Sequence, residues 1–235
     1  MNFDFLSEKV STGEANQTYM DWLLSGAGYT VGISLVAFIL ALTLGIVVGT
    51  LRTTDGWKKR VADIYFEGVR SVPFMAQLFI AYFVVPVVFF PETVKHIHPN
   101  TMTVVTGTLS LAIFMSGRIC AQVYAGLQAL PKSQLQACKA LGFNQVQTYT
   151  EFLLPQALRN ILGTLTSEAL NTVKNSAVVS TIGLTELSNQ AKSIIDYTAK
   201  PYEAFACVIA GYLIINFIVL LLMRLIEKQT SLNPA

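Results

Sequence analysis

Long uncharged apolar runs are the sequence feature that most constrains this chain. Residues 31–51 form one continuous run without a charged side chain, and residues 204–223 form another. A helix needs about 20 such residues to cross the hydrocarbon core of a bilayer, so both runs are long enough to span it. Less regular apolar stretches cover residues 71–91, 101–124 and 155–187. Because backbone groups in lipid must be paired internally, the sequence predicts an all-α, polytopic membrane protein with about five transmembrane helices.

The composition supports a membrane protein and excludes several soluble classes. Apolar residues make up 53% of the chain and charged residues 13%, against about 25% charged residues in a typical soluble domain. A net charge of +2 gives no basis for nucleic acid as a partner. The three cysteines, Cys120, Cys138 and Cys207, contain no CxxC pair, so no disulfide framework or zinc site follows. His96 and His98 fit a solvated loop better than a metal site.

Glycines near the first apolar run form two pairs. Gly28 and Gly32 are four residues apart, and so are Gly45 and Gly49. Small residues at this spacing allow helices to approach closely. The alternative is that glycine is simply common in membrane helices.

Two of the predicted spans are irregular. Pro73 and Pro86 interrupt the run at residues 71–91, which is therefore expected to be bent or discontinuous. The run at residues 155–187 is less apolar and holds several polar groups. A charge at membrane depth is costly and usually faces a protein interior or a wet cavity. The residues that we expect to line a polar pathway on this basis are Arg118, Glu168, Asn171, Lys174, Asn175 and Ser176.

Structural roles stay open for the two cations of this set. Arg118 also fits a snorkelling side chain or a structural charge between helices. Lys174 also fits an interfacial charge or an ion pair between subunits. Glu168 and Lys174 lie six positions apart in the chain, so they do not form the usual i, i+4 helical pair.

Residues 129–159 form a polar island between the third and fourth apolar runs. Within it, residues 133–141 predict a short helix with Leu135, Cys138 and Leu141 three residues apart on one side. A helix of this length is far too short to span a bilayer. We therefore expect the island to form a compact, partly apolar lump outside the membrane.

The ends of the helices in this island are marked by residues with special backbone preferences. Pro131 suits a first helical turn, and Pro155 marks a later boundary where a further helix begins. Gly142 is the natural stop, because helices often end on a left-handed residue that glycine adopts cheaply. Asn144 can then cap a second short helix through Phe152. Two short amphipathic helices meeting at a glycine elbow are suited to docking against another protein; an ordinary helical hairpin is the alternative.

The spacing within this island resembles a known loop. Gln136-Ala137-Cys138, three residues, Gly142, nine residues and then Phe152-Leu153-Leu154-Pro155 are similar to the EAA loop of the membrane subunits of ABC importers. The family pattern is Glu-Ala-Ala, three residues, Gly, nine residues and Ile-x-Leu-Pro. Gln136 replaces the Glu, Cys138 the second Ala and Phe152 the Ile, so Gln136 offers a hydrogen bond in place of an ion pair. The resemblance implies that an ATPase contacts Gln136, Ala137, Cys138, Gly142, Phe152 and Pro155.

The resemblance covers nearly the whole chain after about Ser25. Glu67-Gly-Val-Arg-Ser-Val-Pro73, followed by Gln77-Leu-Phe and Tyr82-Phe, resembles the ELxRxxPLLVQLxxxYF region of polar amino acid importers. The stretches that continue it are residues 154–159, 165–171, 173–178 and 181–187. Within that family the chain looks most like the permeases of glutamate/aspartate importers. An acidic substrate implies a cationic partner, for which Lys174 and Arg118 are the candidates.

The resemblance implies a passive membrane half of a transporter. Two permease subunits, identical or paralogous, form the path, two ATPase subunits bind ATP and Mg at the cytoplasmic loops, and an extracytoplasmic binding protein delivers the amino acid. The chain itself holds no GxxxxGK[ST] phosphate loop, which indicates that ATP is hydrolysed elsewhere. We therefore expect no enzyme activity, no cofactor and no metal in this chain.

The distribution of basic residues predicts the orientation. With five spans and the loop at about residues 129–155 in the cytoplasm, eight basic residues lie on the cytoplasmic side and four on the other, as the positive-inside rule requires. The first group is Arg52, Lys58, Lys59, Arg60, Lys132, Lys139, Arg224 and Lys228, and the second is Lys9, Lys95, Lys192 and Lys200. We expect an extracytoplasmic N-terminal segment at residues 1–24, a permease domain at 25–228 and a cytoplasmic tail at 229–235, in a bacterial inner (cytoplasmic) membrane.

Two other function classes stay open. An ion-coupled secondary transporter also uses broken helices and polar groups inside the membrane, and a non-transport structural membrane protein is the other class. Five spans without an inverted repeat are few for a secondary transporter, and the EAA-like loop has no role in either class. Copurification with an ATPase separates both classes from an importer permease.

Overall fold

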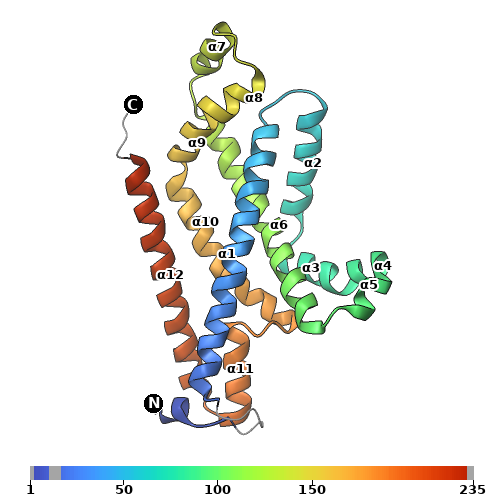
Figure 1. Cartoon of the computed structure of the whole chain (residues 1–235), viewed down its shortest axis with the longest axis vertical. Helices are drawn as coiled ribbons and strands as arrows, with labels where there is room; N and C mark the ends of the chain where they lie inside the picture. Colours follow the sequence, from blue (N-terminus) through green and yellow to red (C-terminus); the bar gives the residue numbers. More distant parts are fainter. Residues whose placement is uncertain (1–2, 11–16, 232–235) are drawn as a thin grey trace. The chain divides into compact units, whose positions relative to one another are not determined.

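The computed structural model describes residues 3–10 and 17–231, and the regular elements within them are helices (Figure 1). In chain order they are η1 (Asp4–Ser7), α1 (Tyr19–Leu51), α2 (Trp57–Ser71), α3 (Phe74–Phe79), η2 (Ile80–Val84), α4 (Val85–Phe89), α5 (Pro91–His96), α6 (Pro99–Gln128), α7 (Lys132–Ala140), α8 (Gln145–Gln147), η3 (Thr148–Leu153), α9 (Leu154–Asn160), α10 (Leu162–Ser176), η4 (Ala177–Ile182), α11 (Leu187–Thr198) and α12 (Pro201–Ser231). The predicted all-α class is confirmed.

Within the described residues, three helices are long and apolar enough to cross a membrane: α1, α6 and α12. A fourth crossing results if α2 and the helical run Phe74–Phe89 are counted as one bent span. The predicted span at residues 155–187 is divided among α9, α10 and η4, and α10 has only 15 residues. Helix length and composition therefore do not confirm the predicted count of five spans.

The predicted interruption of the second apolar run is observed. α2 ends at Ser71 and α3 begins at Phe74, with Pro73 between them. Further along, the chain makes a π-helical turn, η2, before α4, whose first turn contains Pro86. Proline removes a helical hydrogen bond, and both proline and π-turns are recognised causes of kinks. The two prolines and the π-turn account for the division of this run into short helices.

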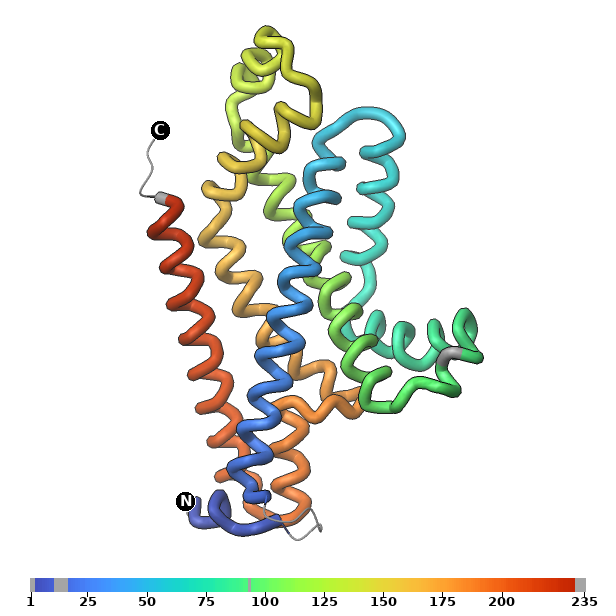
Figure 2. Tube along the Cα trace, viewed as in Figure 1, coloured from blue at the N-terminus to red at the C-terminus, as the bar shows by residue number. Residues whose placement is uncertain are grey.

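The chain divides into two compact units, each assembled from three segments. The first unit comprises Met1–Ala37, Phe74–Leu111 and Asn171–Val219, and the second comprises Phe38–Pro73, Ala112–Leu170 and Leu220–Ala235. The helices α1, α6, α10 and α12 each contribute residues to both units. Figure 2 traces the chain with colours that follow the residue number. Each unit has a buried apolar cluster of its own.

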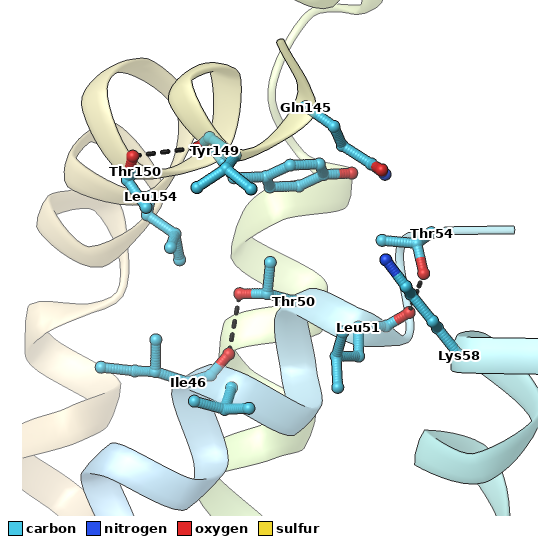
Figure 3. A pocket seen from close by; sticks show the side chains of 11 residues that line it. Ile46, Thr50, Leu51, Thr54, Lys58, Gln145, Tyr149, Thr150 and Leu154 are labelled. Carbon is cyan, nitrogen blue, oxygen red and sulfur yellow. Dashed lines mark hydrogen bonds between the residues drawn. The ribbon is translucent and has the colours of Figure 1, made fainter.

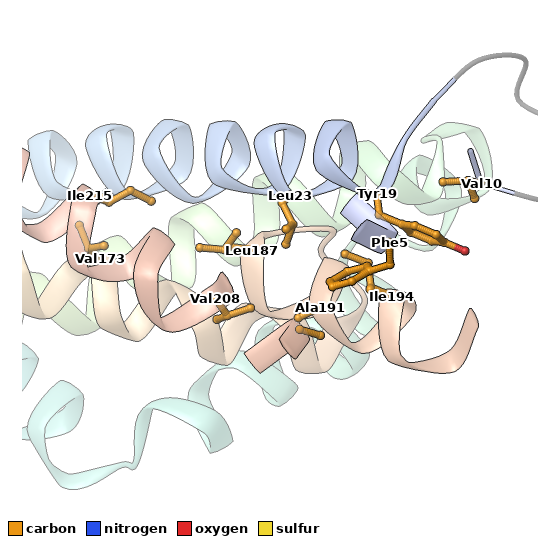
Figure 4. Packing of buried hydrophobic residues seen from close by; sticks show 11 residues of the cluster. Phe5, Val10, Tyr19, Leu23, Val173, Leu187, Ala191, Ile194, Val208 and Ile215 are labelled. Carbon is orange, nitrogen blue, oxygen red and sulfur yellow. The ribbon is translucent and has the colours of Figure 1, made fainter. Parts of the chain in front are cut away.

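The core of the first unit gathers apolar side chains from the N-terminal segment, α1, α11 and α12 (Figure 4). Phe5 of η1 is fully buried in this cluster, and the Lys200 Nζ lies 5.3 Å from the centroid of its ring. Burying a phenylalanine side chain stabilises a fold by about 1.5–3 kcal/mol. Part of the N-terminal segment at residues 1–24 therefore anchors the first unit.

The four glycines near the first apolar run behave in two ways. A Cβ at Gly45 would lie 2.7 Å from a side chain of α6, and one at Gly49 would lie 2.9 Å from another. Both therefore permit close helix packing within the second unit. At Gly28 and Gly32, none of the described residues comes within 4 Å of the Cβ position. The prediction of small-residue packing is confirmed for the second pair, and for the first pair it stays a prediction.

Arg52 joins the end of α1 to α2 and α6 in the second unit. Its Nε donates to Asp63 Oδ1 at 2.7 Å. Its guanidinium carbon lies 3.8 Å from the ring centroid of Phe66 and 4.7 Å from that of Tyr124. Stacking on aromatic rings together with an ion pair is a structural use of arginine. Arg52 is therefore part of the core of this unit, unlike the exposed basic residues that follow it.

Candidate functional site: the coupling segment and the polar pathway

The coupling segment, which we define as residues 129–155, begins with α7. Cys138 is buried on this helix, whereas Leu141 is 75% exposed. Leu141, the residue that follows α7, therefore departs from the predicted apolar stripe. Gln136 and Ala137 are exposed. On this first helix, Cys138 therefore faces inward, whereas Gln136 and Ala137 face solvent.

Gly142 ends this helix in the left-handed conformation, with a φ of 82°. The N–H of Phe143 donates to the carbonyl of Cys138, and the N–H of Gly142 donates to that of Lys139, both at 3.1 Å. This pair of bonds is the Schellman motif, in which a left-handed residue satisfies the last carbonyl groups of a helix. The prediction that Gly142 stops the first helix is confirmed. A residue with a Cβ costs about 1–2 kcal/mol in this conformation.

The second helix of the segment begins with a reciprocal cap. Asn144 Oδ1 accepts from the N–H of Gln147 at 2.9 Å, and Gln147 Oε1 accepts from the N–H of Asn144 at 3.1 Å. α8 continues into the π-helix η3, and the ring centroids of Phe143, just after the elbow, and Phe152 of η3 lie 4.7 Å apart. Pro155 stands in the first turn of α9. The predicted Asn144 cap is confirmed, whereas α9 begins at Leu154 and follows η3 without a break in the helical backbone.

The tip of the coupling segment presents apolar side chains to solvent. Leu141 is 75% exposed and Val146 is 70% exposed, one on each side of the elbow in the chain. Large exposed apolar residues beside polar groups are typical of docking surfaces. Of the residues predicted to contact an ATPase, Gln136, Ala137, Gly142 and Pro155 are exposed, Phe152 is half-buried and Cys138 is buried. Sequence reasoning missed Val146, although an apolar residue in a short helix of a polar island is a usable signal.

The coupling segment is attached to two helices of the second unit. Thr53, just after α1, donates its hydroxyl to Tyr149 Oη of η3 at 2.9 Å. Beyond η3 the chain continues into α9, and Ile161, which follows α9, faces Gly126 of α6 so closely that a Cβ on the glycine would lie 2.8 Å from the isoleucine side chain. The segment is therefore held at the end of α1 and at α6.

Among the pathway candidates, the structure brings Arg118 and Glu168 together. Arg118 Nε donates to Glu168 Oε2 at 2.6 Å, and a terminal guanidinium nitrogen donates to Oε1 at 3.1 Å. The Glu168 side chain is 5% exposed, whereas that of Arg118 is 45% exposed. Both residues belong to the second unit, on α10 and α6. This bidentate pair favours the structural interpretation of Arg118 as a charge between helices.

The other four candidates follow on α10 and belong to the first unit. Asn175 Nδ2 donates to the carbonyl of Asn171 at 2.8 Å. The buried Ser176 hydroxyl donates to the Val173 carbonyl at 2.7 Å, so its proton is used within the helix. Lys174 is exposed, and among the described residues it forms no ion pair. Of the two cations considered for an acidic ligand, Lys174 is therefore the one that no carboxylate of the described chain engages.

A further buried carboxylate, which sequence reasoning did not select, lies in the first unit. Glu186 is fully buried and caps α11, because its Oε1 accepts from the N–H of Asn189 at 2.9 Å. Its Oε2 accepts from Tyr212 Oη at 2.6 Å and from Thr30 Oγ1 at 3.4 Å. Thr30 also accepts from the N–H of Leu187 at 3.2 Å. Glu186 thereby links α1, α11 and α12. Its position directly before a helix was the sequence signal that could have identified it as a helix cap.

Comparison with known proteins gives concordant results. A family model described as "Binding-protein-dependent transport system inner membrane component" matches residues 41–232. The chain is 37% identical over 223 residues to the glutamate/aspartate import permease protein GltJ of Escherichia coli K12, covering 92% of this chain and 90% of that protein. It is 29% identical over 212 residues to the glutamine transport system permease protein GlnP of the same strain, covering 89% and 93%.

Solved structures agree with these relatives. One similar solved structure is described as "Crystal structure of an amino acid ABC transporter with histidines". The TM-score is 0.75 and the identity is 26%, over 90% of this chain and 95% of that one. The chain also resembles the MetNI methionine ABC transporter in an inward-facing conformation at a TM-score of 0.74, over 90% and 97% of the two chains. At 20% identity, the second likeness speaks for the fold alone.

Proposed function

This chain belongs to the family of inner membrane components of binding-protein-dependent transport systems, and on that basis we propose that it carries glutamate, aspartate or a related polar amino acid across the membrane. It is a membrane permease subunit of an ABC importer for amino acids. The acidic substrate is inferred from the likeness to GltJ, which extends over nine-tenths of each chain.

The proposed assembly contains two permease subunits, two ATPase subunits that bind ATP and Mg, and an extracytoplasmic binding protein. The observation that carries the ATPase contact is the left-handed Gly142 elbow between two short helices, with Leu141 and Val146 exposed beside it. A rigid, partly apolar projection of this kind has the chemistry of a docking element. The outward residues Gln136 and Ala137 extend the same surface, and the buried Cys138 supports it from within.

The coupling step follows from how this segment is attached. ATP favours the closed form of the ATPase dimer, and the difference in its affinity for the two forms supplies the free energy. Displacement of the docked segment then acts on α1 through the hydrogen bond from Thr53 to Tyr149, and on α9 through the continuous chain. α9 leads to α10, which carries Glu168 and Lys174. Motion of the ATPase is thereby passed to the helices that face the substrate.

The proposed pathway uses Lys174 to bind a carboxylate of the substrate. Its ammonium is exposed on the polar half of α10, beside Asn171 and Asn175, and it makes no ion pair within the described part of the chain. A cation at such a position in a membrane protein commonly marks a substrate path. Arg118, in contrast, has its guanidinium engaged by Glu168, so we assign that pair to holding the pathway helices together.

The proposed orientation places the N-terminus outside and the C-terminus in the cytoplasm of a bacterial inner membrane. It is supported by the uneven distribution of basic residues and puts the coupling segment on the same side as the ATPase.

The function is tested by uptake of labelled amino acid into proteoliposomes that contain this subunit, its ATPase and its binding protein. Uptake of glutamate and aspartate that requires internal or external ATP and the binding protein supports the proposal. Uptake that follows an ion gradient without ATP would identify a secondary transporter. A correctly inserted protein that transports nothing under either condition would identify a structural membrane protein.

A further inference from the structure

A pocket in the second unit lies where the coupling segment meets the end of α1 (Figure 3). Its volume is about 360 Å³, within the range of ligand pockets, which are about 300–1,000 Å³. The last turns of α1 form one wall, α8, η3 and the first residue of α9 form the opposite wall, and Lys58 of α2 stands at the side. The proposed transport mechanism uses two of the lining residues, Val146 for the ATPase contact and Tyr149 for the bond to Thr53, but it assigns no ligand to the space.

The walls of the pocket are apolar in their chemistry. Ile46, Val47 and Leu51 come from α1, and Val146 and Leu154 come from the other side. The pocket also has threonine side chains, but their hydroxyl protons are used by backbone carbonyls one turn earlier. The three bonds are Thr50 to Ile46 at 2.7 Å, Thr54 to Leu51 at 2.7 Å and Thr150 to Val146 at 2.9 Å. A soluble polar ligand would therefore find few free partners here.

Lys58 supplies the one cation of the pocket lining. Figure 3 shows its side chain extending from α2 towards the space between the two walls. Lys58 is exposed and makes no ion pair among the residues that the structure describes. Lys59 and Arg60 follow it and are exposed as well, while Asp63 is engaged by Arg52, and Asp55 and Glu151 are the exposed acids next to lining residues in the chain. The charge around the pocket is therefore positive.

The position of the pocket along α1 identifies its environment. α1 is long and apolar enough to cross a membrane, and the pocket lies on its last turns, before the basic connection to α2. The end of a spanning helix is the depth at which lipid headgroups meet acyl chains. Basic residues next to such an end attract anionic headgroups. A ligand with an apolar chain and an anionic head fits both the walls and Lys58.

We propose that this pocket binds a membrane phospholipid with an anionic headgroup, with an acyl chain between Val47 and Leu154 and the phosphate at Lys58. Such a lipid contacts α1 and the coupling segment at once, so its presence stiffens the joint that the hydrogen bond from Thr53 to Tyr149 already makes. The proposal does not depend on the transported substrate or on which side of the membrane the pocket faces.

The test is native mass spectrometry of the purified full-length subunit after incubation with phosphatidylglycerol or with phosphatidylcholine of the same acyl chains. We expect phosphatidylglycerol to be retained about fivefold better, as one lysine–anionic lipid contact provides. Lys58→Gln should remove this preference, whereas Lys59→Gln, an equally exposed neighbour that does not line the pocket, should keep it. Val47→Trp should displace the lipid by filling the pocket, whereas Val61→Trp on the exposed side of α2 should not.

Each alternative occupant has its own outcome. Equal retention of both lipids by every variant would mean ordinary boundary lipid. An equal loss of the phosphatidylglycerol preference in Lys58→Gln and Lys59→Gln would mean diffuse electrostatic attraction. Either result overturns the proposal. Glycerol 3-phosphate that competes as well as phosphatidylglycerol would assign the site to a soluble phosphate. Loss of the lipid when the ATPase binds would assign the pocket to that partner. Circular dichroism checks that each variant is folded. If Val47→Trp does not fold, the comparison of Lys58→Gln with Lys59→Gln still tests the proposal.

Discussion

Arg118 holds Glu168 through two hydrogen bonds, at 2.6 and 3.1 Å, across 50 positions of sequence. The carboxylate is almost fully buried, whereas the guanidinium is nearly half exposed. Removal of one partner of this ion pair therefore has a different energetic cost for the carboxylate than for the guanidinium. A buried carboxylate without its cation has no water to solvate it, but an exposed guanidinium does.

Arg118→Met is expected to destabilise the subunit more than Glu168→Gln. Removing the guanidinium takes two charge-assisted hydrogen bonds from a buried carboxylate, and a hydrogen bond to a charged group is worth about 1.5–3 kcal/mol. Glu168→Gln keeps a hydrogen-bond acceptor and leaves an arginine that water can reach. Thermal unfolding of the two purified variants measures the difference. Equal losses of stability would contradict the assignment of Arg118 as the charge that compensates Glu168.

Lys174→Met is expected to impair uptake more than assembly. The substitution removes an exposed cation on α10 that forms no ion pair in the described chain, and it retains much of the side-chain volume. Lys174→Arg keeps the charge and is the matched control. Uptake kinetics and the amount of subunit in the membrane are measured for both. Normal uptake by Lys174→Met would remove Lys174 from the pathway, and loss of that variant from the membrane would indicate an interfacial or intersubunit role.

Much of the coupling segment could be predicted because its signals are local. Gly142, Asn144 and Pro155 act on the backbone within one helical turn, and each does in the structure what its residue type favours. The same holds for Pro73 and Pro86 in the second apolar run. Such residues report on their own conformation, so a single sequence is enough to place them.

The pairs that hold each unit together could not be predicted in this way. Arg118 and Glu168 are 50 residues apart, and Thr30 and Glu186 are 156 residues apart. Nothing in the local sequence says which partner a buried carboxylate selects. Gly28 and Gly45 likewise occur in equivalent four-residue pairs, yet within the described part of the chain Gly45 packs against α6 and Gly28 meets no neighbour, because packing depends on where α6 lies.

Cysteine labelling tests the span at residues 155–187, which the structure divides into short helices. In a background without native cysteines, Lys132→Cys before α9 and Asp196→Cys on α11 are both at exposed positions. We expect a membrane-impermeant reagent to reach Lys132→Cys only from the cytoplasm and Asp196→Cys only from outside. Labelling of both from one side would show that this region does not cross the membrane and that the count of five spans is wrong.

The Gly142 elbow gives a prediction about coupling. Gly142→Asp places a side chain in a left-handed position, which Asp and Asn adopt more readily than other residues with a Cβ, and it adds a charge to the surface that we propose docks on the ATPase. Burying that charge unpaired at an interface is costly. Gly142→Asn is the matched control, because asparagine has nearly the same shape, tolerates the left-handed conformation and carries no charge. We expect the asparagine variant to keep most of the coupling and the aspartate variant to insert normally but lose it.

The central claim is that residues 129–155 transmit ATP-driven motion to the permease. Its most direct test is amino-acid-stimulated ATP hydrolysis by Gly142→Asp in proteoliposomes that contain the ATPase and the binding protein, with copurification of the ATPase as the accompanying readout. We predict that Gly142→Asp either fails to retain the ATPase or retains it without stimulation by the amino acid. ATPase retention and stimulation both at wild-type levels would contradict the claim.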